Sequence, residues 1–214
     1  MRLSTYSNLI RSLPFQDQAF ETKKINWKRQ SEKNKQFKQY CEKEFIEDTI
    51  KLSRRDLFIK SKEDFYGAIV SIIFWGYPRN MRGINFNNIL GSIPKLENAL
   101  RVDKNLTQET FLQICKETEK TGVGLSTLSK FLYFFEFNVK GDKCLILDKR
   151  IIEVLSSGLY DELSSLKKIS EYNKEECYTE YLIEINKISK AQNYKPDQLE
   201  FFLFHFGKNL KSEI

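Results

Sequence analysis

The chain has 214 residues, of which 41% are hydrophobic and 14% aromatic, so it is long and apolar enough to bury a core as one domain or as two small lobes that share a cleft. Its 35 Lys and Arg residues outnumber 29 Asp and Glu residues, and the resulting net charge of +6 favours a polyanion such as nucleic acid or an anionic membrane surface. The N-terminus lacks the apolar core of a signal peptide, and the longest apolar stretch, AIVSIIFWGYP, is too short to span a bilayer. These features predict a soluble cytoplasmic protein.

The cysteines are widely and unevenly spaced. Cys41, Cys115, Cys144 and Cys177 form no C-x-x-C pair, and His205 is the single histidine that could join them around a metal. The sequence therefore predicts reduced thiols that pack against other side chains, with no zinc site, no iron–sulfur cluster and no cofactor.

The first sixty residues are dense in charge but carry a helical pattern. Between Arg29 and Asp56, apolar side chains recur at i, i+3 and i+4 spacing, which predicts an amphipathic helix rather than a tail. This apolar stripe consists of Phe37, Tyr40, Cys41, Phe45 and Ile46. We expect residues 1–60 to form a charged helical segment that packs on a domain formed by residues 61–214.

Most of the remaining chain shows helical periodicity with start and stop signals. Ser61, three residues before Asp64, resembles a cap, Thr107 and Asp148 precede apolar runs, and Pro196 falls in the first turn of another run. Helices are predicted at residues 61–78, 87–100, 107–118, 126–137, 149–157, 174–191 and 196–206. Only KCLILD, residues 143–148, suggests a short extended piece, so the sequence predicts an all-α fold.

A tight turn is predicted at KTGVG, between two of these helices. Gly122 and Gly124 can both take a positive φ without a steric cost, so a helix that ends near Glu119 can reverse and a second can start near Leu125. Backbone N–H groups of such a turn point outward as a phosphate-sized anion site. Two helices joined in this way are typical of a helix–hairpin–helix element that holds a DNA backbone, although G-x-G also ends helices in proteins that bind nothing.

Four stretches together resemble a known family. WGYPRNMRG, GVGLSTLSKFLYF, LILDKRI and FFLFHFGK are similar to the helix–hairpin–helix DNA glycosylases, and most similar to bacterial proteins with the 8-oxoguanine DNA glycosylase fold. The resemblance covers roughly residues 65–208 and leaves residues before 60 uncovered. It implies a two-lobed helical fold with the active cleft between helical subdomains and a hairpin at residues 119–126.

The resemblance also implies roles for individual residues. Gly122, Val123 and Gly124 match the hairpin that grips the DNA backbone, and Asp148 matches the catalytic aspartate. The position of the family's nucleophilic lysine holds Ser126 here, and Lys130 lies one helical turn further along the same face. The lysine stem could still carry its amine to the pocket, so we expect Lys130 to be the second catalytic residue.

These residue types suit the cleavage of an N-glycosidic bond. A fixed carboxylate stabilises the positive charge that develops on the sugar or orients a water, so Asp148 suffices for base removal. A deprotonated lysine that attacks the same carbon forms a Schiff base, after which the strand can be nicked by elimination. The alternatives are structural: Asp148 could be the N-cap of the helix that follows, and Lys130 could be a snorkelling lysine at a helix edge.

Further residues are predicted to contact DNA or the extruded base. Trp75 and Tyr77 could form a base-stacking wall, and Arg79 and Arg82, together with Ser126 of the hairpin, could contact the DNA strand. We also place three residues in the base pocket: Asn88, which follows Asn87 in a stretch similar to an asparagine-rich loop of the family, and His205 and Phe206 of the C-terminal helix. A capping role for Asn88 and a packing role for His205 are the structural alternatives.

The sequence thus predicts a monomeric DNA glycosylase that acts on double-stranded DNA carrying a modified base, with 8-oxoguanine as the first candidate, and that associates with the nucleoid when engaged on DNA. AP-lyase activity would follow from Lys130. One alternative is a catalytically inactive DNA-binding module of the same fold that acts within a larger repair or defence system. Another is a helical protein-interaction or membrane-surface protein, for which hairpin mutations would not weaken partner binding.

Overall fold

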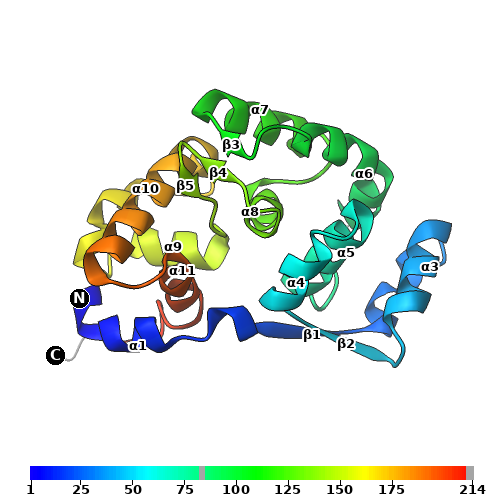
Figure 1. Ribbon diagram of the computed structural model, residues 1–214, viewed down its shortest axis with the longest axis horizontal. Coiled ribbons are helices and arrows are strands. Elements are labelled where there is room, and N and C mark those ends of the chain that lie inside the picture. The colour runs from blue at the N-terminus through cyan, green and yellow to red at the C-terminus, as the bar shows by residue number, and fades with distance from the viewer. Residues whose placement is uncertain (82–84, 211–214) are drawn as a thin grey trace.

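The computed structural model describes residues 1–81 and 85–210, and these residues form a predominantly helical protein with two small β-sheets (Figure 1). The prediction of a mainly helical fold is confirmed, whereas the prediction of an all-α fold is wrong in one respect. Strands β1 (Ala19–Lys23) and β2 (Thr49–Ser53) pair antiparallel, with Phe20 opposite Leu52. Short strands β3 (Asn105–Leu106), β4 (Asn138–Val139) and β5 (Asp142–Lys143) form a second sheet in that order.

The charged N-terminal segment differs from the single long helix predicted between Arg29 and Asp56. Its helix α3 ends at Glu44, and the chain then returns as strand β2, because Ile50 and Leu52 pack toward the core while Lys51 points outward. Ile46, which we placed on the apolar stripe, is 93% exposed. The elements of this segment are η1 (Leu3–Tyr6), α1 (Ser7–Ser12), η2 (Phe15–Asp17), η3 (Lys24–Trp27), α2 (Lys28–Ser31), α3 (Lys35–Glu44) and α4 (Arg54–Lys60).

The helices that follow residue 60 agree closely with the predicted ranges. Thr107, Asp148 and Pro196 begin their helices as expected, but the cap of the helix predicted from Ser61 is Asp64, whose carboxylate accepts the N–H of Gly67. These elements are α5 (Phe65–Gly76), α6 (Asn85–Leu100), β3 (Asn105–Leu106), α7 (Gln108–Glu119), α8 (Leu125–Phe134), β4 (Asn138–Val139), β5 (Asp142–Lys143), α9 (Lys149–Ser157), η4 (Asp161–Lys168), α10 (Lys174–Gln192) and α11 (Pro196–His205).

Helix α8 lies at the centre of the molecule, with α4 and α5 on one side and α9, α10 and α11 on the other (Figure 1). Its residues from Thr127 to Phe134 are buried, which is why the stretch STLSKFLYFF has almost no polar face. Removing these apolar side chains from water stabilises the fold, since each fully buried large side chain contributes about 1.5–3 kcal/mol. The four cysteines are free thiols, as the sequence predicts, and two of them, Cys41 and Cys144, are buried.

The turn between α7 and α8 is as tight as predicted, but its two glycines differ. Gly122 has φ of 86°, and the N–H of Val123 donates to the carbonyl of Thr118. Gly124 has φ of −81° and is the N-cap of α8, so our expectation of a positive φ there is wrong. A single left-handed residue is enough to reverse the chain, because Gly124 then enters α8 from extended backbone.

The first residues of the chain contact its last third. The N-terminal ammonium of Met1 donates to the carbonyl of Leu159 at 2.8 Å, and the N–H of Leu3 donates to the Glu162 carboxylate at 2.9 Å. Further along, Arg54 of α4 reaches Glu200 of α11. Residues 1–60 therefore join both sides of the molecule. Within the two described ranges, every helix is too short or too polar to cross a membrane.

Candidate functional site

A pocket of about 330 Å³ opens beside α8 and contains both residues that we predicted to be catalytic. Lys130 comes from the middle of α8, and Asp148 from the first position before α9. The predicted aromatic residues Trp75 and Tyr77 and the hairpin residue Ser126 also line it. The remaining lining residues are Gln18, Phe20, Arg54, Gly76, Pro78, Ile146, Lys149, Arg150, Glu200 and Phe204.

Lys130 is 5% exposed, and its stem lies along the pocket wall. The Nζ atom donates to the backbone carbonyl of Ser126 at 2.6 Å and lies 3.4 Å from the hydroxyl of the same residue. It also lies 5.5 Å from the centre of the Tyr77 ring, within the range of a cation–π interaction. The Lys130 stem thus spans the one helical turn that separates the two residues in sequence and brings the amine to Ser126.

Asp148 is the N-cap of α9, with one carboxylate oxygen accepting the N–H of Ile151 at 3.2 Å. The other oxygen has no hydrogen-bond partner within the described ranges. The residue is half-buried, because the apolar run Cys144–Leu147 that precedes it lies in the core. Capping and exposure to the pocket therefore coexist in one side chain, since an N-cap uses only one of the two oxygens.

Tyr77 and Trp75 are held in place by hydrogen bonds at their polar ends. The Tyr77 hydroxyl lies 2.6 Å from the hydroxyl of Thr127 on α8. The indole N–H of Trp75 donates to the backbone carbonyl of Gln18 at 3.3 Å, and the guanidinium of Arg54 lies 5.5 Å from the centre of the Trp75 ring. Both aromatic side chains are therefore anchored at their polar ends as well as by packing.

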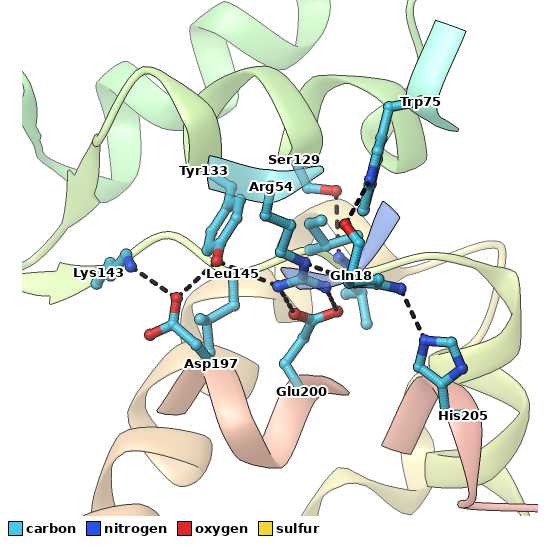
Figure 2. A network of polar contacts seen from close by, with 12 residues as sticks. Gln18, Arg54, Trp75, Ser129, Tyr133, Lys143, Leu145, Asp197, Glu200 and His205 are labelled. Atoms are coloured by element: carbon cyan, nitrogen blue, oxygen red, sulfur yellow. Dashed lines mark hydrogen bonds and ion pairs between the residues drawn. The ribbon is translucent and has the colours of Figure 1, made fainter. Parts of the chain in front are cut away.

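The floor of the pocket is a buried polar network (Figure 2). Arg54 and Glu200 are each 1% exposed, and the guanidinium donates to the two carboxylate oxygens at 2.7 and 3.1 Å. This two-bond geometry is that of a strong, charge-assisted pair. Arg54 also donates to the side-chain oxygen of Gln18 at 2.6 Å and to the hydroxyl of Tyr133 at 3.1 Å.

The network fixes the chemical state of His205. Arg54 can only donate, so the Gln18 atom that faces it is the oxygen, and the Gln18 amide nitrogen must face His205, whose Nε2 lies 2.8 Å away (Figure 2). That Nε2 atom must accept, which requires a neutral imidazole. Consistent with this, burial lowers the pKa of His205, and the positive charges of Arg54 and Arg150 act in the same direction.

The carboxylates of the network lie in different environments. Burial raises the pKa of Glu200, although Arg54 acts against this shift. Burial also acts to raise the pKa of Asp197, but the Lys143 ammonium, 2.7 Å away, and the hydroxyl of Tyr133 outweigh it and hold that pKa below its ordinary value. Asp197 lines a different pocket, so the network runs along α11 from one pocket to the other.

A second hollow of about 450 Å³ adjoins the pocket and shares Tyr77 and Ser126 with it. Gly122 and Gly124 of the interhelical turn line this hollow, whereas Val123 is 1% exposed and packs into the core. Among the described residues, no acceptor binds the backbone N–H groups of Gly124, Leu125 or Ser126. The remaining lining residues are Asn80, Met81, Thr127 and Lys174.

Several predicted site residues lie elsewhere. Asn88 is exposed on α6 and does not line the pocket, because the helix, which was predicted over residues 87–100, directs this side chain to solvent. His205 and Phe206 do not line it either, since Phe204 is the residue that faces the pocket at this end of α11. Arg79 is exposed next to Pro78. Arg82 lies outside the described residues.

Sequence reasoning missed most of the pocket floor. Gln18, Phe20 and Arg54 come from the segment to which we assigned no part of the site, and Glu200 comes from a helix that we examined only at its end. A charged residue inside an apolar helical run, as Glu200 is within LEFFLF, was the available signal. Nothing in the sequence pairs it with Arg54.

The fold and the pocket define a mostly helical protein in which a lysine and an aspartate face one cavity beside a tight interhelical turn. A family model described as "Putative 8-oxoguanine DNA glycosylase OGG-like protein" matches residues 14–204. The chain therefore belongs to this family, which suggests a DNA glycosylase that acts on DNA. The match begins at residue 14, so the family region includes most of the segment that the motif resemblance left uncovered. No curated protein and no solved structure matches the chain.

Proposed function

We propose that this protein is a DNA glycosylase that takes a modified base, rotated out of double-stranded DNA, into the pocket between Lys130 and Asp148. The observation that supports this most is that these two residues, from different helices, line the same cavity. Its volume of about 330 Å³ lies at the lower end of the range of small-molecule pockets. In the proposed two-lobed arrangement, DNA lies across the molecule beside α8.

Asp148 is the proposed source of negative charge for base release. As the N-glycosidic bond breaks, positive charge develops on the sugar, and the carboxylate oxygen left over from capping α9 stabilises it or orients a water. The helix N-terminus holds this carboxylate in place, so little reorganisation is needed during the reaction.

Lys130 is the proposed nucleophile of an additional lyase activity. Attack of the neutral amine on the sugar C1′ atom breaks the bond to the base, which leaves with a proton that the amine gives up. The C1′–O4′ bond of the sugar ring then opens, with O4′ taking the second amine proton, and the resulting Schiff base allows the strand to be cleaved by elimination. To reach the sugar, the Nζ atom must leave the Ser126 carbonyl, which lies 2.6 Å away. A four-carbon stem allows this movement.

The pocket floor favours a guanine-type base, and 8-oxoguanine is the first candidate. Each oxygen of Glu200 accepts one hydrogen bond from Arg54, and a carboxylate can accept about four in total. The remaining positions could accept the ring N–H and amino groups on the pairing edge of guanine. Phe20, Trp75, Tyr77 and Phe204 offer apolar surface on which the base could stack.

The second hollow is the proposed contact with the DNA backbone. In a helix–hairpin–helix element, the outward N–H groups of Gly124, Leu125 and Ser126 would bind phosphate oxygens. The exposed cations Arg79, Lys149 and Arg150 lie near the pocket and could contact neighbouring phosphates. We propose a monomer, because one chain supplies both hollows.

The experiment that tests this function incubates the protein with duplexes that each carry one lesion, 8-oxoguanine first, and then adds borohydride. A covalent adduct with wild type that is lost in Lys130→Gln would identify a lyase and its nucleophile. Alkali-sensitive abasic sites without an adduct, lost in Asp148→Asn, would identify a monofunctional glycosylase.

The alternative is a DNA-binding module without catalysis. It is favoured by the resting positions of the two residues, since Asp148 caps a helix and the Lys130 amine binds a backbone carbonyl. DNA binding without base release or adduct on any lesion would support this alternative and contradict the glycosylase.

A further inference from the structure

Four side-chain hydrogen bonds join the turn that follows α5 to the N-terminal segment. We call residues 77–81 the rim turn, because Tyr77 and Pro78 line the pocket while Tyr77, Asn80 and Met81 line the adjoining hollow. The N–H of Asn80 closes the turn by donating to the carbonyl of Tyr77 at 2.9 Å. Arg79, inside the turn, is exposed.

Two side chains bind the carbonyl of Pro78. The hydroxyl of Thr22 donates to it at 2.6 Å, and the side-chain amide of Asn26 donates at 3.0 Å. The Thr22 oxygen in turn accepts the indole N–H of Trp27 at 2.8 Å, which directs the Thr22 proton toward Pro78. Thr22 is 2% exposed and Trp27 is fully buried, so these donors are fixed by the core.

Asn80 completes the attachment from the other side. Its side-chain nitrogen donates to the backbone carbonyl of Asn26 at 2.5 Å, and its oxygen lies 3.4 Å from the amide nitrogen of Gln30. Asn80 has φ of 77°, a left-handed conformation that Asn adopts more readily than most residues. The rim turn is thus held by four side-chain hydrogen bonds, two at the Pro78 carbonyl and two at the Asn80 side chain, and a turn held in this way is pre-organised rather than adaptable.

We infer that Thr22, Asn26 and Asn80 are positioning residues: they fix the rim turn so that Tyr77 and Arg79 are already in place when a nucleotide enters the pocket. The inference rests on the proposed function and adds a role for residues 22–30, for which no part of the site was predicted. A surface turn needs few tertiary hydrogen bonds for its own stability. A recognition surface, in contrast, loses less conformational entropy on binding when its geometry is fixed before the ligand enters.

The test compares Asn80→Gly with Asn193→Gly. Both asparagines have positive φ, and glycine tolerates that conformation, so each change removes a side chain without backbone strain. Asn193 ends α10, and its backbone carbonyl, which the substitution retains, accepts from Arg11. Glycine raises the conformational entropy of the unfolded chain by a similar amount in the two variants, but only Asn80→Gly releases the rim turn.

Two measurements are made on both variants. Hydrogen exchange of the peptide that covers the rim turn should accelerate in Asn80→Gly and stay at the wild-type rate in Asn193→Gly. Single-turnover base release from a lesion duplex should slow by roughly 10- to 100-fold in Asn80→Gly and stay near the wild-type rate in Asn193→Gly, because a misplacement of about 1 Å has effects of this size. Equal exchange in the two variants, or faster exchange with unchanged release, would overturn the inference.

A second pair of variants tests the hydrogen bond from the Thr22 hydroxyl to the Pro78 carbonyl. Thr22→Val keeps the shape of the side chain and removes the hydroxyl, whereas Thr22→Ser retains the hydroxyl. Release should slow in Thr22→Val and recover in Thr22→Ser. If wild type releases no base from any lesion, the proposed function fails, and the exchange data still decide whether these side chains hold the turn.

Discussion

Gly76, the last residue of α5, packs directly against the stem of Lys130. A Cβ atom at Gly76 would lie 3.0 Å from Cδ and 3.1 Å from Cε of that lysine, closer than side chains normally approach. The absence of a side chain at position 76 therefore allows Lys130 to lie along the pocket wall, between Gly76 and the Tyr77 ring.

We expect Gly76→Ala to displace the Lys130 stem and to reduce any lysine-dependent adduct by about tenfold or more, since a nucleophile must be held within a fraction of an ångström of its productive position. Borohydride trapping measures this. Gly91→Ala in α6 is the control, because a Cβ there meets no heavy atom of the described residues within 4 Å. Equal trapping in both variants would contradict a role for Gly76.

The two roles of Asp148 can be separated by two substitutions. Asparagine is as good an N-cap as aspartate, so Asp148→Asn should change the free energy of unfolding little, whereas Asp148→Ala should lower it by about 1 kcal/mol. Both should slow base release by about 100-fold or more, because both remove the negative charge. Urea unfolding and single-turnover assays measure these effects, and turnover that persists in Asp148→Asn would point to another carboxylate.

The two hairpin glycines should respond differently to substitution. Gly124 has an ordinary φ and open space around its Cβ position within the described chain, and threonine is a good N-cap, so Gly124→Thr should fold normally. Its side chain would obstruct the proposed phosphate site and weaken DNA binding about tenfold or more on every sequence, through lost hydrogen bonds to a charged group. The same change at Gly91 is the control for a titration of DNA affinity.

Gly122→Ala should instead act on stability. Its φ of 86° is unfavourable for alanine, so the free energy of unfolding should fall by about 1–2 kcal/mol. Thermal and urea unfolding measure the loss. A stability equal to wild type would mean that the turn relaxes to another conformation.

Stability should decline in mild acid because of His205. The pKa of His205 in the folded protein lies below its ordinary value of 6.5. At pH values between the folded-state pKa and 6.5, the unfolded chain therefore binds a proton more readily than the folded chain does. The free energy of unfolding should therefore fall as pH drops below about 6.5, where a charged imidazole would place donor against donor at Gln18. Urea unfolding of wild type and His205→Gln measures this, and an unchanged pH dependence in the variant would contradict it.

The sequence predicts those parts of the fold that depend on interactions between residues close together in the chain. Thr107, Asp148 and Pro196 start helices where predicted, because capping depends on residues within one turn of each other. Strands β1 and β2 were missed, because their pairing joins residues that are distant in the sequence and β2 follows a helix within the same charged stretch. Asn88 was misplaced for a related reason, since whether an asparagine faces a cavity or solvent depends on what packs beside its helix.

The sequence by itself determined the α7–α8 turn, the capping aspartate and the lysine one turn into α8, since each follows from local backbone preference and helical spacing. Only the tertiary structure decided that Lys130 and Asp148 share a pocket, that Arg54 and Glu200 form its floor, and that residues 22–30 hold its rim. The physical reason is that burial of a charged residue is favourable only opposite a partner, and that partner can come from any part of the chain.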